Sequence, residues 1–213
     1  MACNIKEKNG HIEPTPPTRG DDVKIVVVGD AKCGKTRFIE AFAKRLRDKS
    51  GSYYSTEYAR VYQCRYKIKT VPREVKIFEI LGGPDNLVNQ LVKDQYDANG
   101  IVFMYAIDDP SSFQMITEKW FETLKNNGCW KFQPTILVGN KRDLREDQQV
   151  IQRLARNNQA PVTEEQGKSL AALNEINEFY ECSSIDHNDF FIRRAFSYIV
   201  SEGYFDWIIS FSE

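Results

Sequence analysis

Two short segments of this 213-residue sequence combine residue types that can bind a nucleotide. The first segment runs from Gly29 to Thr36 and has the spacing G-x-x-x-x-G-K-T. It lies between an apolar, β-branched run and a helical pattern, so its backbone N–H groups can curl around phosphates. Its members are Gly29, Asp30, Ala31, Lys32, Cys33, Gly34, Lys35 and Thr36. Lys35 is expected to reach the β- and γ-phosphates and the Thr36 hydroxyl to bind Mg²⁺, whereas a chance turn before a helix is the weaker alternative.

The second segment, Asn140-Lys141-Arg142-Asp143, follows the apolar run at residues 135–138. A carboxylate only accepts hydrogen bonds, so Asp143 suits the N1–H and exocyclic amine of guanine and repels the ring acceptor of adenine. Lys141 can lie along the base, and Asn140 can brace the two loops. Taken alone the segment is typical of a polar turn. Its position roughly 100 residues after a phosphate loop favours guanine binding.

A third segment, Glu181-Cys182-Ser183-Ser184, ends a later strand pattern. Ser183 and Ser184 can present a backbone N–H group to guanine O6 if this strand lies beside the one before Asn140. Ligands of open α/β sheets bind at the carboxyl ends of the strands, so we expect the three segments to meet there.

Alternating strand and helix patterns must position these segments. Strand patterns occur at residues 23–28, 62–68, 75–80, 101–107, 135–138 and 178–182. Helical patterns occur at residues 35–47, 85–96, 111–126, 163–173 and 192–199. Residues 62–68 alternate apolar and polar side chains, as a half-exposed strand does. We therefore predict an α/β fold of three layers, α/β/α, with a six-stranded, mostly parallel sheet and one antiparallel edge strand.

Composition restricts the class of protein. The chain is 41% hydrophobic and 28% charged, which allows one sizeable core. Lys plus Arg total 29 against 30 acidic residues, so the net charge of −1 argues against nucleic-acid binding through overall charge. No apolar run approaches the ~20 residues that span a bilayer. The five cysteines are scattered without a C-x-x-C pair, which predicts reduced thiols in a cytoplasmic protein.

The domain organisation follows from the same patterns. Residues 1–21 are polar and rich in proline, without the apolar core of a signal peptide, and are predicted to be a flexible arm. Residues 22–203 form the predicted domain, with a charged insert at about 146–158. Residues 204–213 form an apolar tail. We expect this tail to pack on the domain, and the alternative is an anchor for a partner or a membrane surface.

The nucleotide-binding segments resemble those of the Ras superfamily of small GTPases, and specifically the Rho family. The likeness covers about residues 23–200 and includes Glu118-Lys119-Trp120, the run from Val138 to Arg145, Glu181-Cys182-Ser183 and the insert. It implies the P-loop GTPase fold, binding of GTP and GDP with Mg²⁺ at Thr36 and Glu79, and an aromatic cover for guanine at Tyr54. It also implies a molecular switch that meets effectors and regulatory proteins.

The sequence departs from this family where hydrolysis and switching occur. Where the family has Asp-Thr-Ala-Gly-Gln, this chain has Glu79-Ile80-Leu81-Gly82-Gly83. Gly83 has no side chain with which to position the attacking water, and Pro84 stiffens the segment. Ala31 adds a Cβ beside the γ-phosphate position. Val61 aligns with the switch Thr whose hydroxyl binds Mg²⁺ in the family, and Thr56 or Ser55 is the alternative for this position.

These departures predict a Rho-like protein that binds guanine nucleotide but hydrolyses it poorly, with no catalytic residue assigned. The alternative is a pseudo-GTPase scaffold with little or no turnover, and a P-loop kinase or ATPase is disfavoured by Asn140–Asp143. The last cysteine is Cys182, so prenylation at the C-terminus is not expected for this form. We expect a cytoplasmic protein able to associate peripherally with a membrane or the cytoskeleton by other means.

Overall fold

The computed structural model describes residues 22–43, 52–68, 71–82, 98–126, 133–186 and 189–209, with the backbone alone at 52–54, 126 and 204–209. The predicted arm at 1–21, the predicted helix at 85–96 and the pair Gly83-Pro84 lie outside the described residues. Within them, no helix is long and apolar enough to cross a membrane.

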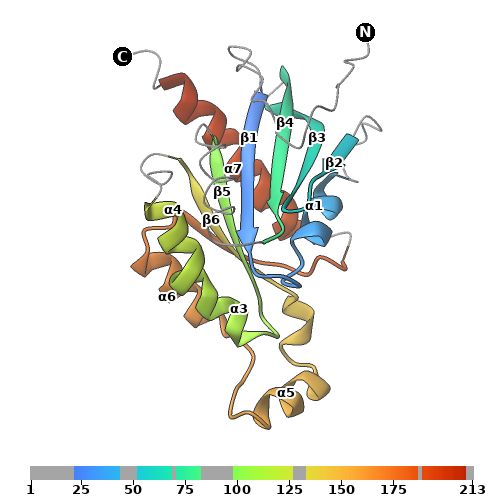
Figure 1. Ribbon diagram of the computed structural model, residues 1–213, viewed down its shortest axis with the longest axis vertical. Helices are drawn as coiled ribbons and strands as arrows, with labels where there is room; N and C mark the ends of the chain where they lie inside the picture. The colour runs from blue at the N-terminus through green and yellow to red at the C-terminus, as the bar shows by residue number, and fades with distance from the viewer. Residues whose placement is uncertain are drawn as a thin grey trace.

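One sheet of seven strands forms the centre of the molecule, in the order β2-β3-β4-β1-β5-β6-β7 (Figure 1). The strands are β1 Asp22–Gly29, β2 Ser52–Ser55, β3 Ala59–Ile68, β4 Val71–Ile80, β5 Gly100–Ala106, β6 Thr135–Asn140 and β7 Glu178–Glu181. Strands β4, β1, β5, β6 and β7 pair in parallel, as predicted. The α/β fold class is therefore confirmed.

The sheet has one strand more than predicted. The short strand β2 pairs antiparallel with residues 60–63 of β3, and β3 pairs antiparallel with β4. Two antiparallel pairs therefore replace the single antiparallel edge strand of the prediction, and β2 takes the edge position. The extra strand was not recognisable because Ser52-Tyr53-Tyr54-Ser55 does not alternate apolar and polar residues.

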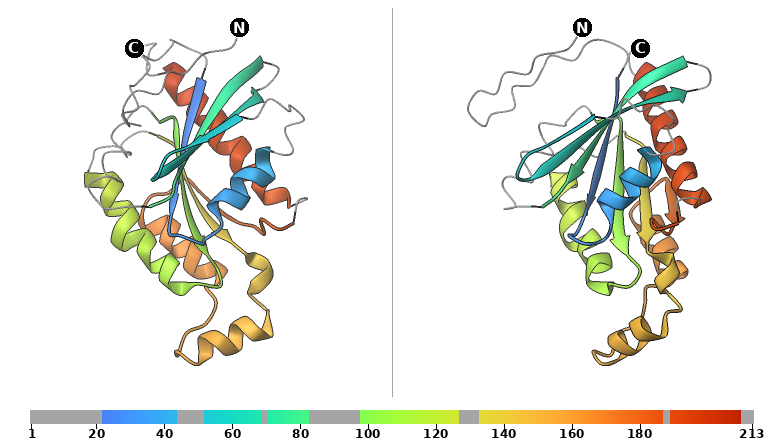
Figure 2. Two further views of the ribbon diagram at one scale, coloured as in Figure 1. Left: turned by 45° about the vertical axis from the view of Figure 1, so that its right-hand side comes forward. Right: turned by 90° about the vertical axis from the view of Figure 1, so that its right-hand side faces the viewer.

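Helices cover both faces of the sheet (Figure 2). On one face α1 (Lys35–Ala43) and α7 (Phe190–Ile209) enclose a core that includes Ile25, Val27, Phe38 and Phe196. On the other face a second core, which includes Val26, Val28 and Trp120, lies under α6 (Glu164–Leu173) and the helical segment at residues 110–126. Neighbouring residues of β1 belong to opposite cores because strand side chains alternate between faces.

The predicted helix at 111–126 forms with a wider turn inside it. It comprises α3 (Pro110–Met115), the π-helical turn η1 (Ile116–Phe121) and α4 (Glu122–Asn126). The residues Glu118-Lys119-Trp120 lie on this π-helical turn, and Trp120 is buried. The capping box of Thr163 and Gln166 at the start of α6 is confirmed.

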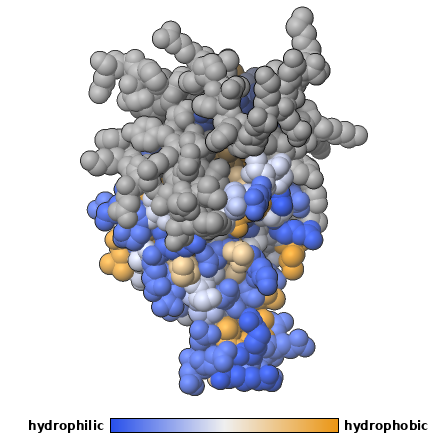
Figure 3. Space-filling model, in the orientation of Figure 1, coloured by the Kyte–Doolittle hydropathy of each residue, from blue (hydrophilic) through white to orange (hydrophobic). Residues whose placement is uncertain are grey.

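The charged insert forms helix α5 (Gln148–Ala155), which projects from the end of the molecule at which β5 and β6 finish (Figure 1). Its visible surface is mainly hydrophilic (Figure 3). The predicted tail begins inside α7, whose backbone continues as a helix to Ile209.

Candidate functional site: a nucleotide cleft

The phosphate loop connects β1 to α1 as predicted. Gly34 has a φ of +97°, and a Cβ there would lie 2.2 Å from Asn140 Nδ2, so only glycine fits. Lys35 is 5% exposed, and its Nζ donates to the carbonyl oxygens of Gly29 at 2.7 Å and Asp30 at 2.9 Å. Ala31 and Lys32 are exposed, and Lys32 adopts a φ of +66°. The loop therefore presents its lysine and backbone at the carboxyl end of the sheet.

The Asp30 side chain connects the phosphate loop to a neighbouring helical segment. Its Oδ1 accepts a hydrogen bond of 2.9 Å from Nε1 of the buried Trp120 on η1. A hydrogen bond to a carboxylate is stronger than one between neutral groups. The π-helical turn thus connects the helix on the second face directly to the phosphate loop.

Asn140 joins the three predicted segments. Its Nδ2 donates to the Cys33 carbonyl at 2.9 Å, and its Oδ1 accepts from the N–H of Ser184 at 3.1 Å and from Ser184 Oγ at 2.7 Å. The Asn140 side chain is 1% exposed. Loss of these hydrogen bonds would leave buried donors and acceptors unsatisfied, which is unfavourable because water cannot replace the missing partners. The bracing role expected for Asn140 matches this geometry.

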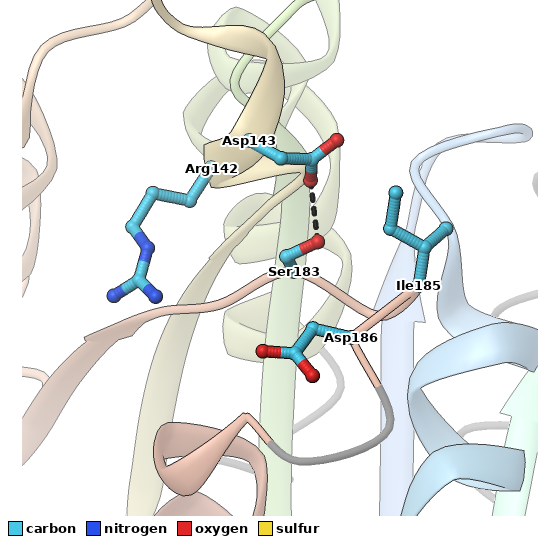
Figure 4. A pocket seen from close by; sticks show the side chains of 5 residues that line it. All are labelled: Arg142, Asp143, Ser183, Ile185 and Asp186. Carbon is cyan, nitrogen blue, oxygen red and sulfur yellow. Dashed lines mark hydrogen bonds between the residues drawn. The ribbon is translucent and has the colours of Figure 1, made fainter.

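Asp143 lines a pocket of about 430 Å³ (Figure 4). The pocket is lined by Arg142, Asp143, Ser183, Ile185 and Asp186. The exposed Asp143 carboxylate accepts a hydrogen bond from Ser183 Oγ. Ser183 belongs to the third predicted segment, which therefore orients this carboxylate. The backbone N–H groups of Ser183 and Ser184 donate to Asp189 and Asn140, which leaves the expected contact with guanine O6 without support at these two groups.

Lys141 lies between this pocket and the insert. Its backbone is left-handed, with a φ of +62°, a strained conformation of the kind that clusters at functional sites. Its Nζ contacts Asp108 Oδ1 at 2.9 Å, and Arg153 of α5 donates to the Asp108 carbonyl at 2.8 Å. Asp108 thus links the base-binding segment to the insert helix.

Thr36 and Glu79, the two residues predicted to hold a metal ion, lie together. Thr36 Oγ1 donates to Glu79 Oε1. Glu79 Oε2 accepts from Tyr62 at 2.9 Å and from Arg60 Nη1 at 3.3 Å, and the same Nη1 lies 3.2 Å from Thr36 Oγ1. A guanidinium group therefore touches both oxygens.

Comparison with known proteins identifies the family of this chain. Residues 24–203 match the family model described as Ras family. The chain is 33% identical to the human Rho-related GTP-binding protein RhoD over 168 residues, 78% of this chain and 77% of that protein. It is also 33% identical to the human Rho-related GTP-binding protein RhoB over 162 residues, 76% of this chain and 79% of that protein. The chain belongs to the Rho family of the Ras superfamily.

The metal position of this Rho family member differs from what Mg²⁺ requires. Mg²⁺ takes oxygen ligands at about 2.0–2.1 Å in near-octahedral geometry. Here Thr36 Oγ1 bonds to Glu79 Oε1, and the permanently charged Arg60 guanidinium contacts Thr36 Oγ1 and the other Glu79 oxygen, Oε2. As arranged, Thr36 and Glu79 therefore do not fit the ion expected from the resemblance.

The first switch segment of the Rho family also takes a different form. Val61 is 2% exposed on β3 and packs in the second core, on the face opposite to Tyr62 and α1. A side chain at position 61 therefore points away from Thr36, and this placement does not support the alignment of Val61 with the switch Thr. The Thr56 hydroxyl bonds to Ala59 within the turn between β2 and β3.

The strand order does not bring Tyr54 to the base pocket. Tyr54 pairs with Val61 on the edge strand β2, and four strands separate β2 from β6, which leads to Asp143. The expected stacking of Tyr54 on guanine is not supported by this placement of its backbone. The position expected for a hydrolytic Gln, Gly83, lies outside the described residues.

Burial suppresses the reactivity of the thiols near the site. It raises the pKa of Cys33, against the opposing effect of Lys35, and it raises the pKa of Cys182 well above its ordinary value. A raised pKa disfavours the thiolate, which is the nucleophilic form of cysteine. Cys33, Cys64 and Cys182 are buried, and none of the three is in a disulfide.

Sequence reasoning missed Arg60, Tyr62 and Trp120 as parts of this site. The register pairs Arg60 directly with Glu79 across β3 and β4, a contact between residues 19 positions apart. The alternating pattern of β3 placed Tyr62 on an inward face, but it could not show which β4 residue it would meet. Trp120 was noticed only as part of a family motif.

Proposed function

We propose that this protein is a guanine-nucleotide-binding signalling switch of the Rho family whose intrinsic GTP hydrolysis is impaired. One observation carries the proposal. Asn140 joins the phosphate loop at Cys33 to Ser184, next to the pocket that holds the exposed Asp143 carboxylate. These contacts support the proposal that the phosphate loop binds the phosphates and that the neighbouring Asp143 carboxylate binds guanine.

Slow hydrolysis follows from the residues at the γ-phosphate end. Gly83 has no carboxamide to position a water molecule, and the Glu79 carboxylate is bonded to Thr36, Tyr62 and Arg60. Family members with complete machinery hydrolyse GTP at only about 10⁻⁴ to 10⁻² per second. We expect effectors and regulators to recognise a nucleotide-bound form that persists.

The test is to denature the purified protein and to identify the released nucleotide by chromatography. We expect guanine nucleotide, with GTP marking a persistent switch and GDP an active hydrolase. ATP would contradict the assignment of the base site, and release of no nucleotide would favour a scaffold.

Single-turnover measurement with GTP then tests the slow step. We expect a rate below about 10⁻⁴ per second, because a water-positioning side chain is lacking. A rate typical of an active family member would overturn the claim of impaired hydrolysis and leave nucleotide binding intact.

A further inference from the structure

The Arg60 guanidinium lies where the family would place a metal ion. We propose that Arg60 is a built-in counter-cation that replaces Mg²⁺ in nucleotide binding, so that this protein binds guanine nucleotide independently of Mg²⁺. The inference rests on the proposed function, because it concerns the phosphate end of the same cleft.

The sheet register builds this cation into the fold. Arg60 on β3 and Glu79 on β4 are direct cross-strand partners, and residues directly opposite each other on one face interact most closely. Tyr62, two residues further along the same face of β3, donates to Glu79 Oε2 at 2.9 Å. The position of Arg60 is therefore set by backbone pairing over the whole of β3 and β4 as well as by its own ion pair.

Burial makes a cation necessary at this point. The Glu79 side chain is 2% exposed, and a buried carboxylate requires a partner of opposite charge and hydrogen bonds. Arg60, Tyr62 and Thr36 supply both. The family Asp at this position has Mg²⁺ as its nearby cation, whereas Glu79 is one methylene longer and meets the guanidinium instead.

A guanidinium group is suited to the task that the ion would perform. It is always charged, it carries five N–H donors in a planar fork, and it matches phosphate oxygens well. The Arg60 Nη1 atom lies 3.2 Å from Thr36 Oγ1, the residue that follows the phosphate-binding Lys35. The Arg60 side chain is 29% exposed, so it borders the solvent-accessible side of this cluster. A divalent ion at this position would be repelled by the Arg60 guanidinium. Its candidate ligands, Thr36 and Glu79, are already hydrogen-bonded to each other.

The decisive experiment measures the affinity for fluorescently labelled GDP and GTP in EDTA and in millimolar Mg²⁺. For the unaltered protein we expect the two affinities to agree within about threefold, since the bound cation is part of the chain. A loss of about tenfold or more in EDTA would overturn the proposal. Absence of binding in both conditions would instead refute the proposed function, so the two failures are distinguishable.

The matched variants are Arg60→Gln and Arg65→Gln. Arg65 forms the same kind of cross-strand pair with Glu74 on the same two strands, but at an exposed position. We expect R60Q to weaken binding in EDTA by about tenfold or more, and R65Q to leave it unchanged. Equal effects of the two variants would contradict a specific role for Arg60.

R60Q leaves the buried Glu79 carboxylate without its cation and could therefore unfold the protein. A double variant separates loss of nucleotide binding from loss of folding. R60Q/E79D restores the carboxylate of the family and opens the position beside Thr36. We expect this variant to bind nucleotide with a preference for Mg²⁺ of about tenfold or more over EDTA, and its thermal midpoint in GDP to rise on addition of Mg²⁺. A folded double variant that remains indifferent to Mg²⁺ would overturn the proposal.

Discussion

The base end and the cation end of the cleft use similar polar contacts for different purposes. At the base end, Asn140 joins the phosphate loop to Ser184, and Ser183 donates a hydrogen bond to the exposed Asp143 carboxylate. At the cation end, Arg60 and Tyr62 enclose the Glu79 carboxylate, so that it is satisfied within the protein. The Asp143 carboxylate is exposed and accessible to a ligand, whereas the Glu79 carboxylate is buried and paired with Arg60.

This difference shows how recognition and turnover can separate within one fold. The contacts at the base end come from β6, β7 and the phosphate loop, whereas those at the cation end come from β3, β4 and α1. The described hydrogen bonds at the two ends share no side chain. We therefore expect substitutions at the cation end to leave the hydrogen bonds of the base end intact.

The comparison is tested most strongly at Asp143. We expect Asp143→Ala to weaken binding of GDP and GTP at least about 100-fold, because each hydrogen bond to a charged group contributes about 1.5–3 kcal/mol. Titration calorimetry with GDP measures the change. Asp186→Ala, at another acidic residue of the same pocket, is the control and should change affinity little. Equal losses would mean that pocket charge in general, and no specific pairing, attracts the nucleotide.

The second prediction concerns the brace between the two ends. Asn140→Ala removes buried hydrogen bonds to Cys33 and Ser184, and it should lower the free energy of unfolding by about 2–4 kcal/mol. Urea denaturation followed by circular dichroism measures it. Asn157→Ala, at an exposed position after α5, is the control. A stable N140A protein would show that the loops do not depend on this side chain.

The smallest expected effect is a pH dependence at the cation end. Burial raises the pKa of Tyr62 to about 12, and the nearby Glu79 carboxylate acts in the same direction. A raised pKa in the folded state means that the stabilising contribution is complete below the unfolded value of about 10 and is lost as pH rises from there to about 12. The loss from this one group is at most about 3 kcal/mol.

Tyr62→Phe should flatten the decline of stability between pH 10 and 12, as measured by urea denaturation at each pH. Tyr66→Phe, at a tyrosine on the same strand whose hydroxyl pairs with Ser197, provides the control. An unchanged alkaline decline in Y62F would show that the pKa of Tyr62 is not raised in the folded protein.

Most of the sheet and the base end could be predicted from the sequence. The buried runs at β1, β5 and β6 are continuous apolar segments, and the capping box of α6 lies within four residues. The meeting of Asn140 with the phosphate loop was expected because parallel strands end at the same edge. Such features depend on local patterns or on a general rule of sheet topology.

The cation end could not be predicted in the same way. Alignment placed Val61 at the switch position, but the early start of β3 at Ala59 turns that side chain into the second core. Tyr54 lies on the short edge strand β2, and the alignment could not show that these residues form a strand. A shift of one position along a strand reverses the face of every side chain, so an alignment by residue identity cannot determine these contacts.

The sequence by itself determined the phosphate-loop motif, the Asn140–Asp143 motif predicted to bind guanine and the absence of a side chain at Gly83, since each is contained in a few consecutive residues. The tertiary structure alone decided that Arg60 meets both Thr36 and Glu79. That contact depends on the register between β3 and β4 and on the packing of α1 against their sheet. These are long-range pairings, and their free energy comes from the whole sheet and not from any local motif.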